Sequence, residues 1–361
     1  MAVCPRPKGE GAVRILLTGG AGFIGHHTVE HILETTDWNL VVLDGLTYAG
    51  DVARLTDIDG YDPTRVKVLW HDLRSPIGSG LDDRIGYVDA VIHAAAESHV
   101  DNSLARPADF FLANAAITVN MLEWARTRFL THFIQVSTDE VYGPVPLGRP
   151  SREWDPQLPS NPYSGSKSAQ EAAAIAWWRS FNVPVVITNT MNNFGERQGP
   201  EKFIPKTIKT FLAGEKMTVH GAIVGKKIVR TVKGTDEAVD DWVASSRVWL
   251  HARNHADALC FLLQQPVTRY DRTNLWPDRW NVAGDREVDG IEMIGFIARA
   301  MGLESWGCDL VDHHSSRPGH DLRYSLDGSK LRMAGWMAPV PFEESLERTV
   351  RWTMKRREWL L

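Results

Sequence analysis

The chain has 361 residues, with 40 Lys and Arg against 45 Asp and Glu, and a formal net charge of −5 at pH 7. This mildly acidic balance excludes a nucleic-acid binder that relies on bulk positive charge. With 43% hydrophobic and 24% charged residues, the composition excludes disorder as the main state. No apolar run approaches the roughly 20 residues of a membrane-spanning helix, and the first residues lack the apolar stretch of a secretory signal. We therefore expect a cytoplasmic protein with no membrane partner.

The cysteine and tryptophan contents bear on sites. The cysteines, Cys4, Cys260 and Cys308, are widely separated and odd in number, which argues against a disulfide framework and against a four-ligand zinc site. No bound metal is expected. The 14 Trp serve cores, interfaces and ligand stacking alike, so their number alone assigns no function.

The first half of the chain alternates short β-branched apolar runs with longer helical patterns. The predicted strands are Val13–Thr18, Asn39–Asp44, Val66–His71, Asp89–Ala94, His132–Thr138 and Pro184–Asn189. The predicted helices are Gly22–Glu34, Ala108–Arg126 and Asn161–Phe181. This alternation predicts an α/β fold with a doubly wound parallel sheet of the Rossmann type over residues 1–192.

Beyond about Asn193 the pattern breaks into shorter pieces rich in Pro and Trp. These predict a smaller mixed C-terminal substrate domain over residues 193–361, packed on the end of the sheet. We expect the chain to return to the first domain around residues 247–265.

A glycine-rich turn follows the first predicted strand. It places Gly19, Gly22 and Gly25 at the spacing G-x-x-G-x-x-G before an apolar helix, where glycine permits a tight turn and close approach to a pyrophosphate. Asp44 ends the next strand, where its carboxylate can accept hydrogen bonds from an adenosine ribose and would repel a 2′-phosphate, which favours NAD over NADP. Asp72 follows the third strand and is a candidate partner for the adenine amino group. The alternative is a glycine turn that binds no ligand.

A tyrosine and a lysine lie one turn apart on the predicted helix that starts at Asn161-Pro162. A phenol has an ordinary pKa near ~10, and a neighbouring ammonium together with the positive nicotinamide favours the phenolate. Tyr163 and Lys167 could therefore take a proton from a hydroxyl while hydride leaves for the cofactor. Because such a pair is common by chance, its weight comes from the upstream strand ending in Ser137 and Thr138, whose hydroxyls can orient a substrate alcohol.

Two carboxylates follow directly at the carboxyl end of that strand, where doubly wound folds place their ligands. Asp139 and Glu140 are read in two ways: as a solvated turn, or as an acid and a base with separated pKa values. The spacing alone leaves both open.

In these motifs the sequence resembles the dTDP-glucose 4,6-dehydratases of the extended short-chain dehydrogenase/reductases. The similar segments run in order along nearly the whole chain: TGGAGFIG, DGLTYAG, AAESHVD, STDEVYG, NPYSGSK, TNTMNNFG, GPEKFIP and RPGHDLRY. The pair STDEVYG and ESHVD is the specific signal, because epimerases of the same superfamily share the glycines and Tyr-x-x-x-Lys but usually lack the Asp-Glu pair.

The resemblance implies a mechanism with tightly bound NAD that is recycled in each turnover. Tyr163 would be the base for oxidation of the sugar 4-hydroxyl, with Lys167 lowering its pKa and Thr138 hydrogen-bonding the hydroxyl. Glu140 would remove the proton from carbon 5 and later return it, while Asp139 would protonate the leaving 6-hydroxyl. The product would be a 4-keto-6-deoxy sugar nucleotide, and the protein would be a homodimer joined through helices near 108–126 and 161–181.

The resemblance also implies the binding residues. For NAD these are Gly19, Gly22, Phe23, Ile24, Gly25, Asp44, Thr47, Asp72, Leu73, Ala94, Tyr163 and Lys167. For the nucleotide-sugar substrate they are Ser98, His99, Asn193, Glu201, Lys202, Arg247, Asn281, Arg317, His320 and Arg323. Any one of the substrate residues could equally be a structural salt bridge or cap.

Two segments depart from the family pattern. About 20 extra residues separate Gly221 from a triplet that reads Arg247-Val248-Trp249, where the family has Arg-Asp-Trp, and Leu322 replaces an Arg. We expect the insert, at about residues 222–246, to form a surface hairpin near the nucleotide mouth or at a subunit contact.

Alternative functions remain at this stage. The substrate could be UDP-glucose or a UDP-N-acetyl sugar, because thymine and uracil differ by one methyl group, worth only ~1–3 kcal/mol in a pocket. A sugar-nucleotide 4-epimerase or decarboxylase would explain the glycines, Thr138, Tyr163 and Lys167 but not the Asp-Glu pair. A non-catalytic NAD-sensing module is disfavoured because no catalytic position that can be aligned has been lost.

Overall fold

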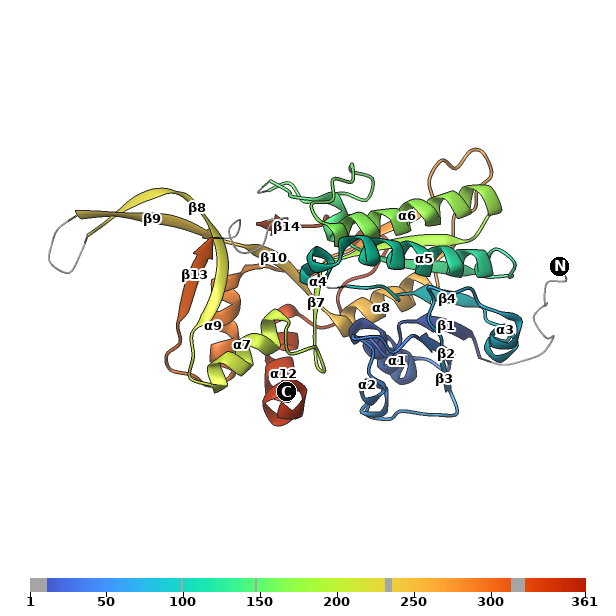
Figure 1. The fold of residues 1–361 in the computed structure, drawn as a ribbon, viewed down its shortest axis with the longest axis horizontal. Coiled ribbons are helices and arrows are strands. Elements are labelled where there is room, and N and C mark those ends of the chain that lie inside the picture. The colour runs from blue at the N-terminus through green and yellow to red at the C-terminus, as the bar shows by residue number, and fades with distance from the viewer. Residues whose placement is uncertain (1–11, 99, 147, 231–235, 313–321) are drawn as a thin grey trace.

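The computed structural model describes residues 12–98, 100–146, 148–230, 236–312 and 322–361. Within these residues, a seven-stranded parallel sheet forms the centre, with the strand order β11-β6-β5-β4-β1-β2-β3. Its strands are β1 (Arg14–Thr18), β2 (Asn39–Asp44), β3 (Val66–Trp70), β4 (Ala90–His93), β5 (His132–Thr138), β6 (Val185–Thr190) and β11 (Asp278–Val282). The prediction of a doubly wound parallel sheet is confirmed (Figure 1).

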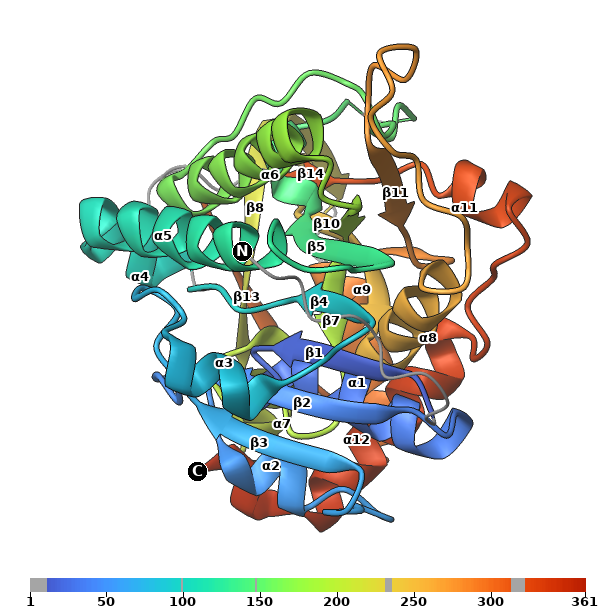
Figure 2. The same ribbon diagram turned by 90° about the vertical axis from the view of Figure 1, so that its right-hand side faces the viewer.

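Helices cover both faces of this sheet (Figure 2). One face packs against α3 (Ser79–Ile85), α5 (Pro107–Ala125) and α6 (Pro162–Phe181), and the other against α1 (Phe23–Thr35), α2 (Val52–Thr56) and α8 (Ala252–Leu262). Successive side chains of a strand point to opposite faces, so Leu16 enters the first core while Ile15 and Leu17 enter the second. Burial on both faces explains why inner strands such as β1 and β4 are nearly continuous apolar runs rather than alternating ones.

The predicted elements of the first half are present, with ends that differ by at most one residue. Strand β11, which joins the central sheet beside β6, is not among the predicted strands. The run Asp278–Val282 mixes charged and apolar residues, and its pairing partner lies far away in the chain, so local pattern did not reveal it. Helix α8 packs against α1, which brings this later segment back to the first domain.

The smaller region is mixed. Strands β7 (Asn192–Phe194), β10 (Ser246–His251), β12 (Glu287–Asp289) and β14 (Arg323–Tyr324) pair with one another around β10. Helices α7 (Phe203–Leu212), α9 (Gly290–Ala300) and α12 (Phe342–Lys355) enclose an apolar core that includes Phe194, Ile208 and Met293. The described elements also include the short helices α4 (Val100–Ala105) and α11 (Ser329–Met333) and the 3-10 turns η1 (Asp139–Tyr142) and η2 (Arg357–Leu360).

The predicted insert forms an antiparallel hairpin of β8 (Met217–Arg230) and β9 (Asp236–Ala244), with β13 (Cys308–Asp312) alongside the base of β8. Figure 1 shows this hairpin reaching out from the body of the molecule. In its register Lys226 pairs with Asp240 and Arg230 with Asp236. Its role at the nucleotide mouth or at a subunit contact stays a prediction.

Among the described helices, none combines the length and apolar character needed to cross a bilayer.

Candidate active site

The glycine turn between β1 and α1 has almost no room for side chains. Gly19 has a φ of +73°, and a Cβ on it would lie 2.9 Å from the backbone of Ala95. A Cβ on Gly25 would lie 2.1 Å from the carbonyl oxygen of Gly19. Helix α1 has Gly22 as its N-cap, which provides no side-chain hydrogen bond, so the first N–H groups can meet an anion. Phe23 and Ile24 form the start of that helix.

Asp44 lies beside this turn at the end of β2. Its Oδ2 accepts the N–H of Ala21 at 2.9 Å and its Oδ1 accepts the N–H of Leu46 at 2.8 Å. Each carboxylate oxygen keeps lone pairs for a further donor, such as a ribose hydroxyl. The chemistry and placement of the turn and of Asp44 therefore fit a dinucleotide.

The other predicted cofactor residues follow neighbouring strands. Asp72 already forms a two-pronged pair with Arg74, with Nε at 2.9 and 3.0 Å from its two oxygens, and this hydrogen bond lowers the pKa of Asp72. Leu73 is buried in the core and Thr47 is exposed. Ala94 follows β4 and its N–H donates to the carbonyl of Thr18 at 3.3 Å.

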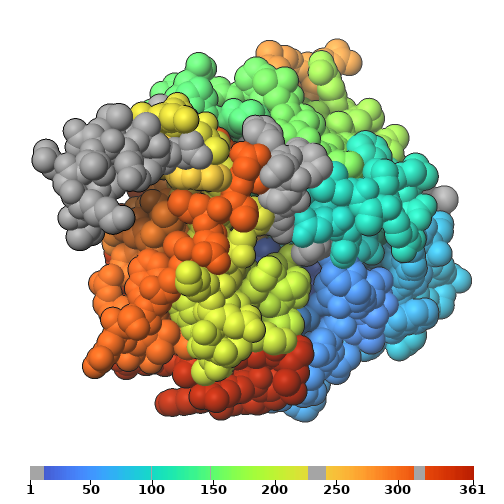
Figure 3. Space-filling view, turned by 60° about the vertical axis from the view of Figure 1, so that its left-hand side comes forward, coloured from blue at the N-terminus to red at the C-terminus, as the bar shows by residue number. Residues whose placement is uncertain are grey.

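A hollow opens at this end of the molecule. Figure 3 shows it between the yellow-green atoms around α7 and the cyan atoms around α4 and α5, with dark blue atoms of the first described residues at its bottom. The dark blue colour covers β1, the glycine turn and α1 together. A ligand entering the hollow would thus meet residues of both domains.

Helix α6 presents Tyr163 and Lys167 on one face. It starts with a capping box in which the Asn161 side chain accepts the N–H of Ser164 at 2.9 Å, and Pro162 occupies its first turn. The Lys167 Nζ donates to the carbonyl oxygen of Val136 at 2.8 Å, and burial lowers its pKa to about 8. Burial and the charge of Glu140 raise the pKa of Tyr163, against a hydrogen bond with Thr138. Burial and the Glu140 charge thus favour the protonated phenol.

Thr138, Asp139 and Glu140 lie where β5 passes into the turn η1. The Thr138 hydroxyl donates to Asp139 Oδ1 at 3.0 Å and accepts the N–H of Glu140 at 3.3 Å. The Asn161 amide donates to Glu140 Oε2 at 3.3 Å. The structure thus brings the five predicted catalytic residues together at the carboxyl end of β5 and the start of α6.

The two adjacent carboxyl groups have different surroundings. Asp139 is only 3% exposed, and its Oδ2 has no hydrogen-bond partner among the described residues. Burial, followed by the charge of Glu140, raises the pKa of Asp139 to about 7, whereas the Glu140 side chain is half-buried. A solvated turn would not bury Asp139 in this way, so the geometry favours an acid beside a base.

Among the predicted substrate residues, three lie near the beginning of the smaller domain. Asn193 donates to Thr190 Oγ1 at 3.1 Å and to the Met191 carbonyl at 2.9 Å, while its buried Oδ1 has no partner in the described ranges. Lys202 Nζ is 3.7 Å from Glu201 Oε1, and both side chains are partly exposed. Ser98 is exposed on the segment before α4.

The two predicted arginines within the described residues, Arg247 and Arg323, already have protein partners. Arg247 Nη1 donates to the carbonyls of Ser246 at 2.7 Å and Leu322 at 2.8 Å, and its guanidinium lies 4.6 Å from the centre of the Tyr324 ring. Arg323 forms two 2.7 Å hydrogen bonds with the Glu287 carboxylate.

Asn281 is fully buried in β11. Its amide donates to the carbonyls of Ser151 at 2.9 Å and Asp327 at 3.3 Å, so it ties loops together. His99, Arg317 and His320 lie outside the described residues.

Sequence reasoning missed a second buried polar group beside the site, formed by Glu171 on α6 and Arg279 on β11. Arg279 Nη2 lies 2.6 Å from Glu171 Oε2, with both side chains buried. The only feature of the sequence that could have indicated this pair is the acidic Glu171, one helical turn after Lys167.

The fold and the site define a Rossmann-type enzyme with a Tyr–Lys pair on the helix after a Thr-Asp-Glu turn. The chain belongs to the NAD dependent epimerase/dehydratase family, whose model matches residues 15–283. A dTDP-glucose 4,6-dehydratase from Escherichia coli is 33% identical, over 96% of this chain and 95% of that protein.

Solved structures of nucleotide-sugar enzymes are similar to this chain over nearly its whole length. DesIV, a dTDP-glucose 4,6-dehydratase from Streptomyces venezuelae crystallised with NAD and TYD, has a TM-score of 0.80 and 33% identity, over 96% of this chain and 98% of that one. The UDP-glucose 4-epimerase of Thermus thermophilus, in complex with NAD, has a TM-score of 0.77 and 26% identity, over 95% of this chain and 99% of that one.

Proposed function

We propose that the protein is an NAD-dependent 4,6-dehydratase of a nucleotide sugar and that its substrate is dTDP-glucose. The observation that carries the proposal is the pair of adjacent carboxyl groups, one buried and one half-buried, next to Thr138, Tyr163 and Lys167. A 4-epimerase needs Thr138, Tyr163 and Lys167 for its oxidation and reduction steps. It eliminates no water, so it has no step for such an acid and base to catalyse.

The residues of the glycine turn and Asp44 would hold NAD, through the N-terminus of α1 and the free lone pairs of the carboxylate. When bound, NAD supplies the group that takes up and returns a hydride. Thr47, Leu73 and Ala94 lie just after the ends of the neighbouring strands. Because the Leu73 side chain is buried, Leu73 would contact NAD through its backbone.

The protein's own groups would move the protons. Tyr163 takes the proton of the sugar 4-hydroxyl, which Thr138 orients, and the Lys167 ammonium stabilises the resulting phenolate. The ketone at carbon 4 makes the hydrogen on carbon 5 acidic. Glu140, which is partly accessible, removes that proton.

Asp139 acts as the acid in the elimination. With a pKa raised to about 7 by burial, it carries a proton near neutral pH and can donate it to the leaving 6-hydroxyl, which departs as water. Glu140 later returns a proton to carbon 5. The product is the 4-keto-6-deoxy sugar nucleotide.

The nucleotide-sugar contacts and the quaternary structure belong to the same proposal. Asn193, with a buried acceptor that lacks a protein donor in the described ranges, and Glu201 with Lys202 would contact the substrate. Exposed apolar side chains on α5 and α6, including Phe111 and Leu112, support a homodimer through those helices. A cytoplasmic location is proposed with it.

The test is incubation of the purified protein with dTDP-glucose, UDP-glucose and a UDP-N-acetyl sugar in parallel. Alkali-induced absorbance of a 4-keto-6-deoxy product, largest with dTDP-glucose, is the expected result. Formation of the 4-epimer without that absorbance would show an epimerase. Product from a UDP-sugar alone would keep the reaction and change the nucleotide. A Tyr163→Phe variant is the matched control and should form no product.

A further inference from the structure

A buried carboxylate lies one turn beyond Lys167 on the same face of α6. Glu171 is 0% exposed. Its Oε1 accepts the side-chain N–H of Asn189 at 2.7 Å, its Oε2 pairs with Arg279 at 2.6 Å, and Gln157 donates to Oε2 as well. Both carboxylate oxygens thus have side-chain donors, one of them a guanidinium, and such charge-assisted pairs fix the geometry of the carboxylate. The proposed reaction does not use it.

Asn189 connects this carboxylate to the active-site turn. It lies on β6 beside Ser137 of β5, and its Nδ2 also donates to the carbonyl oxygen of Thr138 at 3.0 Å. That carbonyl belongs to the peptide that joins Thr138 to Asp139. Glu171 orients the Asn189 amide, and through it the backbone from which the side chains of Asp139 and Glu140 project.

The same carboxylate is the negative charge that acts on Lys167. Burial lowers the pKa of Lys167, and the charge of Glu171 opposes that effect. In the described ranges no carboxylate forms a direct ion pair with Lys167. Of the other titratable groups that face it, His93 on β4 has its pKa lowered to about 3 by burial and is neutral, and Tyr163 is the phenol that Lys167 is to assist.

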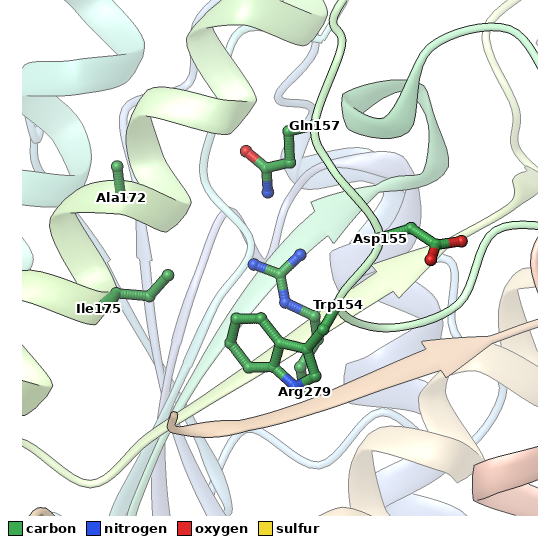
Figure 4. Close-up of a pocket in the computed structure, with 6 residues that line it drawn as sticks. All are labelled: Trp154, Asp155, Gln157, Ala172, Ile175 and Arg279. Atoms are coloured by element: carbon green, nitrogen blue, oxygen red, sulfur yellow. The ribbon is translucent and has the colours of Figure 1, made fainter. Parts of the chain in front are cut away.

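Arg279 is in turn enclosed. Its side chain is 2% exposed, and the Trp154 ring lies 4.4 Å from its guanidinium carbon. Figure 4 shows the guanidinium between the Trp154 ring and the Gln157 amide, with the Asp155 carboxylate directed away. Both side chains of the ion pair are almost inaccessible to solvent, and charges act over longer distances in such a medium.

We propose that Glu171, fixed by its ion pair with Arg279, is a positioning residue for the active site. It orients Asn189 and thereby the Thr138–Asp139 peptide, and it supplies the negative charge that keeps the Lys167 side chain an ammonium beside Tyr163. The inference rests on the proposed roles of Tyr163 and Lys167.

Two variants separate this role from a merely structural one. Glu171→Gln keeps an acceptor for Asn189 but removes the charge and leaves Arg279 buried without its partner, so thermal stability should fall. Adding Arg279→Met removes the second charge, and neutral replacements of a buried ion pair are often well tolerated. The double variant should regain most of the lost Tm while Lys167 still lacks its counter-charge.

The decisive measurement is pH dependence. In the double variant the alkaline limb of the rate of product formation should move to lower pH by roughly one unit. A lysine with a lowered pKa binds fewer protons in the folded than in the unfolded state, so stability rises with pH above the folded value, about 8 in the parent protein. The onset of this rise in Tm should therefore move to lower pH too. An Asp278→Asn variant, which removes a carboxylate from β11 that does not act on Lys167, should move neither.

The outcomes are distinct. If the parent protein forms no product but the onset of the Tm rise moves, the proposed function fails and the role of Glu171 stands. Suppose instead that the parent protein forms product, and that in the double variant neither the alkaline limb of the rate nor the pH at which Tm begins to rise differs from the parent. Glu171 is then only a structural ion-pair partner and the inference is wrong.

Discussion

Two buried polar clusters of this protein differ in how their charges are paired. The active-site cluster comprises Thr138, Asp139, Glu140, Tyr163 and Lys167. In it, one oxygen of Asp139 lacks a partner among the described residues, and Lys167 donates to a single backbone carbonyl. The pKa of Asp139 is raised to about 7 and that of Lys167 lowered to about 8.

The inter-domain cluster joins α1 to the smaller domain and comprises His27, Glu30, Glu196, Arg197 and His251. The N–H of Arg253 donates to His251 Nδ1, so His251 Nε2 carries the proton and donates to Glu196 Oε2 at 3.0 Å. Although burial acts to raise the pKa of Glu196, that hydrogen bond and nearby charges hold it well below its ordinary range. Arg197 pairs with Glu30 at 3.5 Å.

The difference shows what each cluster is suited to do. Buried groups whose partners neutralise them stabilise one arrangement of the chain, here the junction of the domains. Buried groups with few partners lower the stability of the fold, but their pKa values lie near neutral pH, where they can exchange protons. Variants in the two clusters should therefore change different properties.

The largest effect is expected from Glu140→Gln. Without the proposed base, exchange of the carbon 5 proton with solvent and overall product formation should fall by about 10²–10⁴-fold, the range that general-base catalysis supplies. Reduction of bound NAD by substrate should persist, because the base for that step is Tyr163. Mass spectrometry in deuterated water measures the exchange. Glu123→Gln, on the exposed side of α5, is the control with parent activity, and unimpaired exchange in Glu140→Gln would remove the base assignment.

A smaller effect, on stability, is expected from His251→Ala in the inter-domain cluster. It removes the N–H donor of a buried carboxylate and the side-chain acceptor at the start of α8, together about 2–4 kcal/mol. Urea unfolding measures the loss.

The matched control meets the same carboxylate from the exposed side. Arg348 lies 3.3 Å from Glu196 Oε1 and is 62% exposed, so Arg348→Gln should cost less than about 1 kcal/mol. Equal losses for the two variants would contradict the role assigned to His251.

The smallest effect is a gain in stability for Asp139→Asn, which should be inactive. Because the folded pKa of Asp139 is about 7 and the unfolded value about 3.9, the folded chain binds the extra proton between these pH values. The cost of burying the carboxylate is thus absent below pH ~4 and complete above pH ~7. Relative to the parent, Asp139→Asn should be stabilised by on the order of 1–2 kcal/mol at pH 8 and unchanged at pH 4. The measurement is the Tm of both proteins between pH 4 and pH 8. A Tm difference that stays constant over this pH range would contradict the prediction.

Much of the fold could be predicted because its signals are local. Strands buried on both faces must be apolar throughout, and the turn before α1 must be glycine, since a Cβ on Gly25 would collide with the Gly19 carbonyl oxygen. β11 was missed because its only fixed partner among the described strands is β6, which lies far from it in the chain.

The candidate site divides in the same way. Tyr163 and Lys167 share a helix face by spacing alone, and Thr138, Asp139 and Glu140 are consecutive at a strand end. The spacing left two readings of the carboxyl pair open, because neighbours in the chain can have opposite burial. The structure buries Asp139 and leaves Glu140 partly accessible.

By itself the sequence determined the strand and helix order, the glycine turn with Asp44, and the Tyr–Lys spacing, since each follows from neighbouring residues and the geometry of one element. Only the tertiary structure decided that Arg279 meets Glu171 and that Asn281 ties two loops together. It also decided that Asp139 is buried away from water while its neighbour is not. These are pairings and burial between segments distant in the chain, and they depend on how whole elements pack rather than on any local pattern.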